Sequence, residues 1–254
     1  MIGIFDSGTG GMSVYREIRK VLPRERYVYF SDNAHCPYGD KTAEYVRDRG
    51  REITRFLLGK GADVIVIACN TATAAAVSAL RAEFPDTPFI GMEPAVKPAA
   101  LGTKTGVIGV LATAGTLKGS KYLTTRGKYA DDVRIVEAVG RGFVELVEAG
   151  KLDGPETEAV VDRSLRPLLD AGADTVVLGC THYPFLAGVI GRLAGPDVRV
   201  IDPAPSVARH LADVMTQRNL IRRDAVAEND IELVSSGDPA PLERIYRMIN
   251  EEKI

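Results

Sequence analysis

Two cysteines in matching sequence contexts are the side chains best suited to chemistry. Cys69 ends the segment GADVIVIAC and Cys180 ends GADTVVLGC; the two agree at five of nine positions, and the other four are conservative exchanges. Thiols on opposite sides of one carbon atom could remove its proton and return another from the far face. The pair therefore indicates inversion of a stereocentre, although cysteine at a strand end is also an ordinary buried core residue.

Small polar side chains follow several predicted strands. In open α/β sheets, ligands bind beyond the carboxyl ends of the strands, and hydroxyl, amide and acidic groups there suit a carboxylate or ammonium ligand. The candidate binding residues are Asp6, Ser7, Asn70, Thr71, Thr113, Thr116, Thr181 and His182. Backbone N–H groups at the helix starts after both cysteines are expected to favour the thiolates.

Other positions allow both a functional and a structural interpretation. Asp6 with Ser7 could hold an ammonium group or relay a proton, or could cap the next helix. The segment DSGTGG (6–11) lacks the P-loop lysine and the GxGxxG spacing, so it does not predict a nucleotide site. Tyr38 and Gly39, in CPYG, could contact a ligand or form a rigid turn, whereas no chemistry is assigned to Cys36, which has no repeat partner.

The elements that must position these residues alternate between short β-branched runs and amphipathic segments. A helix is expected over 43–58, where Val46, Ile53, Phe56 and Leu57 share a face. Strands are predicted at 2–5, 27–31, 64–68, 106–111, 133–138, 175–179, 198–201 and 231–235. Near-continuous apolar strands between helices predict an α/β fold with mainly parallel sheets covered on both faces.

The repeat predicts two similar three-layer α/β lobes, related by a pseudo-two-fold axis, with the active site between them. A second pair of segments, beginning at Ile2 and Ile108, recurs in the same order. Chance likeness between apolar strands is the alternative. Prolines near Glu93–Pro98 and Asp202–Pro205 mark the crossings, so we expect a discontinuous first lobe (1–95 with 206–254) and a second lobe at 96–205.

Composition excludes several classes of protein. The chain has 254 residues, 45% hydrophobic and 26% charged, with a net charge of −2 and no basic block, so we expect no nucleic-acid partner. No apolar run approaches membrane-spanning length, and the N-terminus lacks the pattern of a signal peptide. Three cysteines and three histidines at these spacings match no zinc motif. We expect a cytoplasmic protein without a membrane partner or a metal.

The order of the motifs resembles that of the bacterial glutamate racemases, in the aspartate/glutamate racemase superfamily. The motifs are IGIFDSGTGG, CPYG, ACNTA, GMEP and LGCTHYP, and the likeness continues to SGDP at 236–239. One departure is His35, where many members carry arginine. Because of this difference, the resemblance does not predict how this loop closes over the substrate.

The resemblance implies cofactor-independent interconversion of L- and D-glutamate, which supplies D-glutamate for peptidoglycan. By analogy, Cys69 takes the proton of D-glutamate and Cys180 that of L-glutamate, and Glu148 lies near a catalytic His182. The expected catalytic set is therefore Cys69, Cys180, Asp6, His182 and Glu148. The resemblance also implies substrate contacts at Asp6, Ser7, Tyr38, Gly39, Asn70, Thr71, Thr181 and His182, and less firmly at Thr113 and Thr116.

Other functions remain open at this point. Aspartate or hydantoin racemases would share the thiol pair. From different classes, a Cys-His hydrolase could use Cys180 and His182, although residues two apart need not face each other, and a two-lobed protein could bind an amino acid without catalysis. We also expect a homodimer, the commonest closed assembly.

Overall fold

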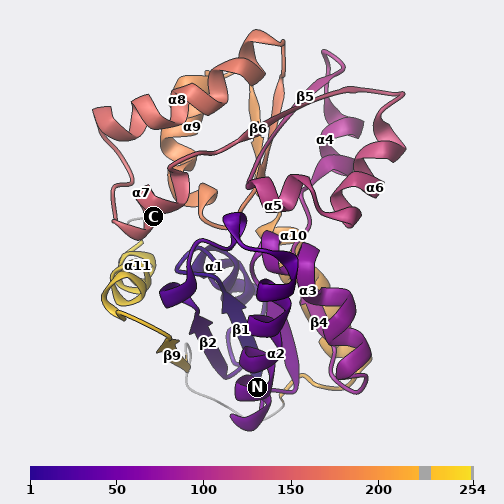
Figure 1. Cartoon of the computed structure of the whole chain (residues 1–254), viewed down its shortest axis with the longest axis vertical. Coiled ribbons are helices and arrows are strands. Elements are labelled where there is room, and N and C mark those ends of the chain that lie inside the picture. Colours follow the sequence, from indigo (N-terminus) through magenta and orange to yellow (C-terminus); the bar gives the residue numbers. More distant parts are fainter. Residues whose placement is uncertain (223–229, 253–254) are drawn as a thin grey trace.

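The chain forms two lobes stacked along its long axis, each built on a parallel sheet (Figure 1). The computed structural model describes residues 1–222 and 230–252; parts of the predicted first-lobe range, 223–229 and 253–254, lie outside the described residues. Among the described residues, no helix has both the length and the apolar character needed to cross a bilayer.

The first sheet has the strand order β4-β3-β1-β2-β9, and all of its strands are parallel. Its strands are β1 (Ile2–Asp6), β2 (Tyr27–Ser31), β3 (Val64–Ile67), β4 (Phe89–Gly91) and β9 (Ile231–Ser235). The second sheet has the order β6-β5-β7-β8 and is also parallel. Its strands are β5 (Val107–Ala112), β6 (Arg134–Val139), β7 (Thr175–Gly179) and β8 (Arg199–Ile201).

The two sheets repeat one topology. Read from β4 and from β8, the orders β4-β3-β1-β2 and β8-β7-β5-β6 are equivalent, and β9 is an addition to the first sheet. The predicted α/β class with two similar parallel lobes is confirmed. Of the nine strands within residues 1–222 and 230–252, eight lie where the sequence predicts them; β4, with only three residues, was not predicted.

A shared helix ending explains the repeated Gly-Ala-Asp. Gly61 and Gly172 have φ of +89° and +88°, a region that suits glycine. The next N–H in each lobe, of Ala62 and Ala173, donates to a carbonyl of the preceding helix at 3.1 Å. This glycine-based end lets the chain turn at once into the buried strands β3 and β7.

Helices cover both faces of each sheet. In the first lobe they are α1 (Met12–Val21), α2 (Ala43–Gly59), α3 (Asn70–Glu83), α10 (Ala204–Gln217) and α11 (Ala240–Asn250). In the second lobe they are α4 (Val96–Gly102), α5 (Ala114–Leu117), α6 (Ser120–Tyr129), α7 (Phe143–Glu148), α8 (Pro155–Asp170) and α9 (Ala187–Ala194). Three 3₁₀ turns, η1 (Asn33–His35), η2 (Tyr38–Asp40) and η3 (Tyr183–Leu186), lie on strand-to-helix connections.

Alternating strand residues feed opposite apolar layers. In β1, Ile2 and Ile4 face the layer of α1, α10 and α11, whereas Phe5 faces the layer of α2 and α3. The first of these layers continues into the second lobe, where β7 packs against α8 and α9. The expected helix over 43–58 is confirmed as α2, although Phe56 remains 37% exposed.

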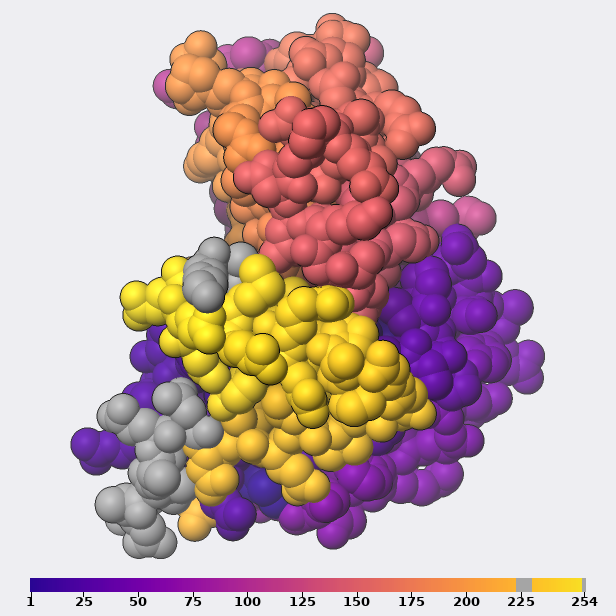
Figure 2. Space-filling model, turned by 90° about the vertical axis from the view of Figure 1, so that its left-hand side faces the viewer, coloured from indigo at the N-terminus to yellow at the C-terminus, as the bar shows by residue number. Residues whose placement is uncertain are grey.

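The chain returns to the first lobe at its end. Helix α10 packs on α1, and β9 pairs with β2 at the sheet edge. Figure 2 shows residues 230–252 covering one side of the first lobe, directly below the second. The predicted boundaries, 1–95 with 206–254 and 96–205, stay a prediction.

Candidate active site

The strand-end residues of both lobes lie at the interface between them. Cys69 follows β3 and is 5% exposed, and Cys180 follows β7 and is 7% exposed. The neighbouring strands β1 and β5 add Asp6 with Ser7 and Thr113. The sheet topology therefore brings both cysteines and the predicted polar residues to one buried region.

Cys69 is the N-cap of α3. Its Sγ accepts a hydrogen bond from the Ala72 N–H at 3.4 Å and lies 3.9 Å from the Ser7 Oγ. Burial and then the Asp6 carboxylate raise the pKa of Cys69, while the Ala72 N–H lowers it by less. The expected helix-start hydrogen bond is present, but in the closed protein burial outweighs it and favours the neutral thiol.

Cys180 has a different partner. Thr181 and His182 separate it from η3, and its Sγ lies 3.8 Å from the His182 Nδ1. Among the described residues, the side-chain partner of the Cys180 sulfur is thus an imidazole, and the expected help from helix-start N–H groups stays a prediction for Cys180. The two residues face each other despite being only two positions apart.

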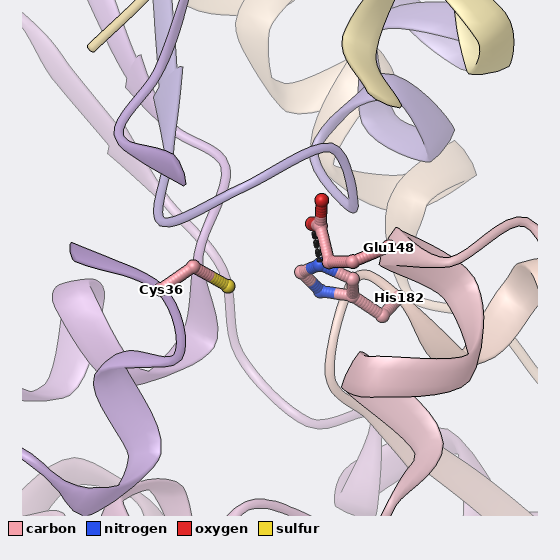
Figure 3. Close-up of side chains that lie close together, drawn as sticks. All are labelled: Cys36, Glu148 and His182. Atoms are coloured by element: carbon pink, nitrogen blue, oxygen red, sulfur yellow. Dashed lines mark hydrogen bonds and ion pairs between the residues drawn. The ribbon is translucent and has the colours of Figure 1, made fainter. Parts of the chain in front are cut away.

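His182 is held by Glu148, the last residue of α7 (Figure 3). The His182 Nε2 and the Glu148 Oε1 are 2.7 Å apart. Burial opposes the charged imidazole, but hydrogen bonds to Cys180, Cys36 and Glu148 raise the pKa of His182 well above its usual value. Burial likewise opposes the carboxylate, yet His182 holds the pKa of Glu148 below its usual value. The arrangement favours an imidazolium beside Cys180.

The glycine turn after β1 makes this arrangement possible. Thr9 donates to the Glu148 Oε1 from its backbone N–H at 2.7 Å and from its hydroxyl at 3.1 Å. A Cβ added at Gly8 would lie 2.1 Å from that oxygen, and one at Gly10 would lie 2.2 Å from the His182 Nδ1. Gly8 and Gly10 are therefore required because second-lobe side chains press against the turn. Thr9 was not among the predicted residues.

The buried carboxylate of Asp6 stabilises the same turn by accepting hydrogen bonds from its backbone. This carboxylate accepts hydrogen bonds from the Gly11 N–H at 3.0 Å, the Gly8 N–H at 3.3 Å and the Thr181 hydroxyl at 3.4 Å. Burial raises the pKa of Asp6, and the His182 charge lowers it by less. Asp6 thus organises the turn, as the capping interpretation predicts, and also reaches the second lobe.

A chain of hydroxyl groups crosses the interface. The Thr71 Oγ1 lies 2.8 Å from the Thr113 Oγ1, which lies 2.9 Å from the Thr116 Oγ1. Beside them, Asn70 is 4% exposed, and neither its amide oxygen nor its amide nitrogen has a partner among the described residues. A buried amide without partners is costly unless a ligand satisfies it.

The CPYG turn closes one side of the region. The Tyr38 hydroxyl donates to the Asp32 Oδ2 at 2.5 Å, so its polar group is already engaged. Gly39 packs on Thr113, to which an added Cβ would lie 3.2 Å away. His35, the departure noted above, instead meets the Tyr45 hydroxyl through its Nδ1 at 2.5 Å.

Asp32 anchors this turn through Arg49, and the pair provides a stability prediction. Arg49 donates hydrogen bonds to both carboxylate oxygens of Asp32, at 2.7 Å and 2.9 Å. Burial alone would raise the pKa of Asp32, but the hydrogen bonds from Arg49 and Tyr38 outweigh burial and lower this pKa from 3.8. Arg49→Leu leaves a buried carboxylate short of its main partner and should cost about 2 kcal/mol in the free energy of unfolding at pH 7.

Urea unfolding checks this value, with Arg51→Leu as the control, because Arg51 forms its ion pairs at the surface. The carboxylate of Asp32 stabilises the fold above its unfolded pKa of about 3.8, and this contribution is lost as pH falls through its lowered folded pKa. The difference between wild type and Arg49→Leu should therefore shrink below pH 3.8. Equal losses in both variants at pH 7 would contradict the assignment.

Cys36 is the site neighbour that the sequence reasoning set aside. Ligand-type atoms of Cys36, Glu148 and His182 lie within 4.8 Å of one another (Figure 3). The absence of a repeat partner hid this thiol, since the loop that carries it bends toward the second lobe only in the folded chain.

Comparisons with known proteins match this chain to racemases over nearly its full length. The family model of the Asp/Glu/hydantoin racemases matches residues 2–211. The glutamate racemase of Stutzerimonas stutzeri is 48% identical, with 98% of this chain and 93% of that protein covered. A glutamate racemase isoform from Bacillus anthracis has a TM-score of 0.86 at 31% identity and covers 99% of this chain and 94% of its own. The Escherichia coli glutamate racemase, in complex with L-glutamate and the activator UDP-MurNAc-Ala, has a TM-score of 0.86 at 33% identity, covering 98% and 94%.

Proposed function

Since the chain belongs to the Asp/Glu/hydantoin racemase family, among the bacterial glutamate racemases, we propose that it interconverts L- and D-glutamate with Cys69 and Cys180 as its two bases. The reaction uses no cofactor and supplies D-glutamate for peptidoglycan. The main support is the pair of buried strand-end thiols, Cys69 after β3 of the first lobe and Cys180 after β7 of the second. The complex of the Escherichia coli relative with L-glutamate supports the substrate.

The proposed reaction balances with two thiols and no other reagent. The Cys69 thiolate removes the Cα proton of D-glutamate, and the electron pair of the C–H bond remains on the carbon. The Cys180 thiol then donates its proton to the opposite face, which gives L-glutamate. The enzyme is left with a Cys69 thiol and a Cys180 thiolate, the state that accepts L-glutamate for the reverse reaction.

A carbanion next to a carboxylate needs strong electrostatic stabilisation, because the Cα–H is a far weaker acid than a thiol. The proposed donors to the substrate carboxylates are the amide of Asn70, which has no partner within the described part of the chain, and the hydroxyls of Thr71 and Thr113. Thr181 is a further donor from the second lobe. Preorganised donors in a buried site contribute several kcal/mol each to such a transition state.

Burial of both thiols implies that the lobes must separate to admit glutamate and close again before the proton moves. Closure excludes water and strengthens each hydrogen bond to the substrate. The homodimer and the cytoplasmic location stay predictions.

A substitution at Gly115, where η2 of the first lobe contacts α5 of the second, tests whether this contact is needed for closure of the lobes. A Cβ added at Gly115 would lie 2.8 Å from the Thr71 Cγ2 and 3.3 Å from the Gly39 carbonyl oxygen. Gly115→Ala should therefore hold the lobes slightly apart and lower kcat/KM by about tenfold to a hundredfold, since displacements near 1 Å have such effects.

Steady-state racemisation assays measure this effect, with Gly127→Ala as the control, because a Cβ at Gly127 meets no atom within 4 Å. The control should retain the wild-type kcat/KM. Unchanged activity in Gly115→Ala would show that this contact takes no part in closure.

The decisive experiment is incubation of the purified protein with L-glutamate in heavy water without added cofactor. Circular dichroism should show loss of optical activity, and mass spectrometry should show one deuterium at Cα of the D-glutamate formed. A panel of aspartate and hydantoin enantiomers separates the related racemases. Inversion without deuterium uptake would contradict proton transfer through the thiols.

A hydrolase is the second candidate because a thiol, an imidazole and a carboxylate lie in a row. The Cys180 Sγ lies 3.8 Å from the His182 Nδ1, and the His182 Nε2 lies 2.7 Å from the Glu148 Oε1. In the racemase proposal this row instead assists proton transfer by Cys180. Hydrolysis of a thioester that survives Cys69→Ala would favour the hydrolase.

A further inference from the structure

We propose that Cys36, Glu148 and His182 form a site for a thiophilic divalent cation, Zn²⁺ above all, and that the bound ion inhibits the enzyme by joining the two lobes. The inhibitory consequence rests on the proposed function, whereas binding of the ion does not. In this site, Cys36 comes from the connection between η1 and η2, while Glu148 ends α7 and His182 precedes η3.

The donor set and its spacing suit zinc. One sulfur, one ring nitrogen and one carboxylate oxygen lie within 4.8 Å of one another, and Zn²⁺ binds such atoms at about 2.0–2.3 Å, usually with tetrahedral geometry. Figure 3 shows the Cys36 sulfur directed toward His182 and Glu148 from the opposite side. Small rotations of the side chains would bring all three atoms to one ion, and water would complete the tetrahedron.

The carboxylate has an oxygen to spare, whereas His182 would exchange one of its present contacts, with Glu148 or with Cys180, for the ion. The Glu148 Oε1 takes the hydrogen bonds of Thr9 and His182, while its Oε2 has no partner among residues that the structure describes. Gly8 lets Glu148 and Cys36 approach the same point of the turn, since a Cβ there would lie 2.1 Å from the Glu148 Oε1 and 3.1 Å from the Cys36 Sγ. Glu148 has a side-chain exposure of 19%, and Cys36 is partly exposed, so an ion can reach the cluster from solvent.

Binding would change both the lobes and the chemistry. Coordination releases the thiol proton of Cys36 and the proton of the coordinating His182 nitrogen to solvent, with no change of oxidation state. The ion then links the first lobe to the second and prevents the opening that the buried thiols require. It also engages His182, the imidazole that faces the Cys180 sulfur, and the carboxylate of Glu148 that holds this imidazole.

Cobalt provides a readout that does not depend on activity. Metal-free protein titrated with Co²⁺ should develop a sulfur-to-cobalt charge-transfer band and the visible bands of a tetrahedral ion. Cys36→Ser should lose the charge-transfer band. His35→Ala is the matched control, because His35 is the next residue and turns instead to Tyr45, and it should retain the spectrum.

Racemase assays then test the consequence. Zn²⁺ should inhibit the wild type and His35→Ala, and a chelator should restore activity. Measured against its own metal-free activity, Cys36→Ser should need at least about tenfold more Zn²⁺ for half inhibition, since even outer partners of a metal site change affinity by that factor.

Unchanged inhibition and an unchanged cobalt spectrum in Cys36→Ser would overturn the proposal and place the ion elsewhere, for example on Cys69 and Cys180. If metal-free protein does not racemise glutamate, the proposed function fails, but the cobalt spectra still decide whether the site exists.

Discussion

Cys69→Ala and Cys180→Ala should each lower racemisation by about 10⁴-fold in both directions, because each variant lacks one of the two groups that move the proton. Polarimetry with either enantiomer measures the loss. Glu145→Gln, at an exposed position of α7, is the control and should remain active. Substantial inversion by either alanine variant would contradict the two-base mechanism.

The variants also distinguish which thiol serves which enantiomer. Each retains one base, so in heavy water Cys180→Ala should exchange the Cα proton of D-glutamate only, and Cys69→Ala that of L-glutamate only. NMR of the Cα proton follows this exchange. The opposite pattern would reverse the assignment, which rests on resemblance to the family.

Glu148→Gln should lower kcat/KM by about 10²-fold. Glu148 accepts from His182 at 2.7 Å, and the amide keeps the shape of the side chain while removing the charge that stabilises the imidazolium beside Cys180. Loss of a buried electrostatic partner of this kind has effects of roughly this size. Steady-state kinetics with each enantiomer provides the measurement.

The control is Glu145→Gln, on the same helix but at an exposed position, which should leave kcat/KM unchanged. If Glu148 acts through His182, the double variant Glu148→Gln/His182→Asn should be little slower than His182→Asn alone. Additive losses would mean that Glu148 acts independently, through Thr9 and the glycine turn.

The parts of the fold predicted from sequence are those that local chemistry determines. Gly61 and Gly172 end their helices in a conformation that suits glycine, and buried strands follow at once, so the repeat was visible without coordinates. The placement of Cys69 and Cys180 follows from the same repeat, because each cysteine follows the equivalent strand, β3 or β7, at the carboxyl end of its own sheet. The roles of these cysteines stay predictions.

Other features depend on contacts between distant segments. Thr9 and Glu148 are 139 positions apart, and only the packing of α7 on the glycine turn brings them together. Cys36 reaches His182 in the same way, through a loop whose course the sequence does not encode in a periodic pattern. The strand β4 was missed because its three residues are too few to establish a period.

The discontinuous first lobe has a consequence for synthesis on the ribosome. All four strands of the second sheet are translated before α10 and β9, so that sheet can form while the first is still incomplete. Until α10 emerges, the apolar side of α1, including Val14 and Ile18, lacks the helix that covers it. Late in translation the nascent chain thus exposes an apolar surface, the kind of surface that chaperones bind.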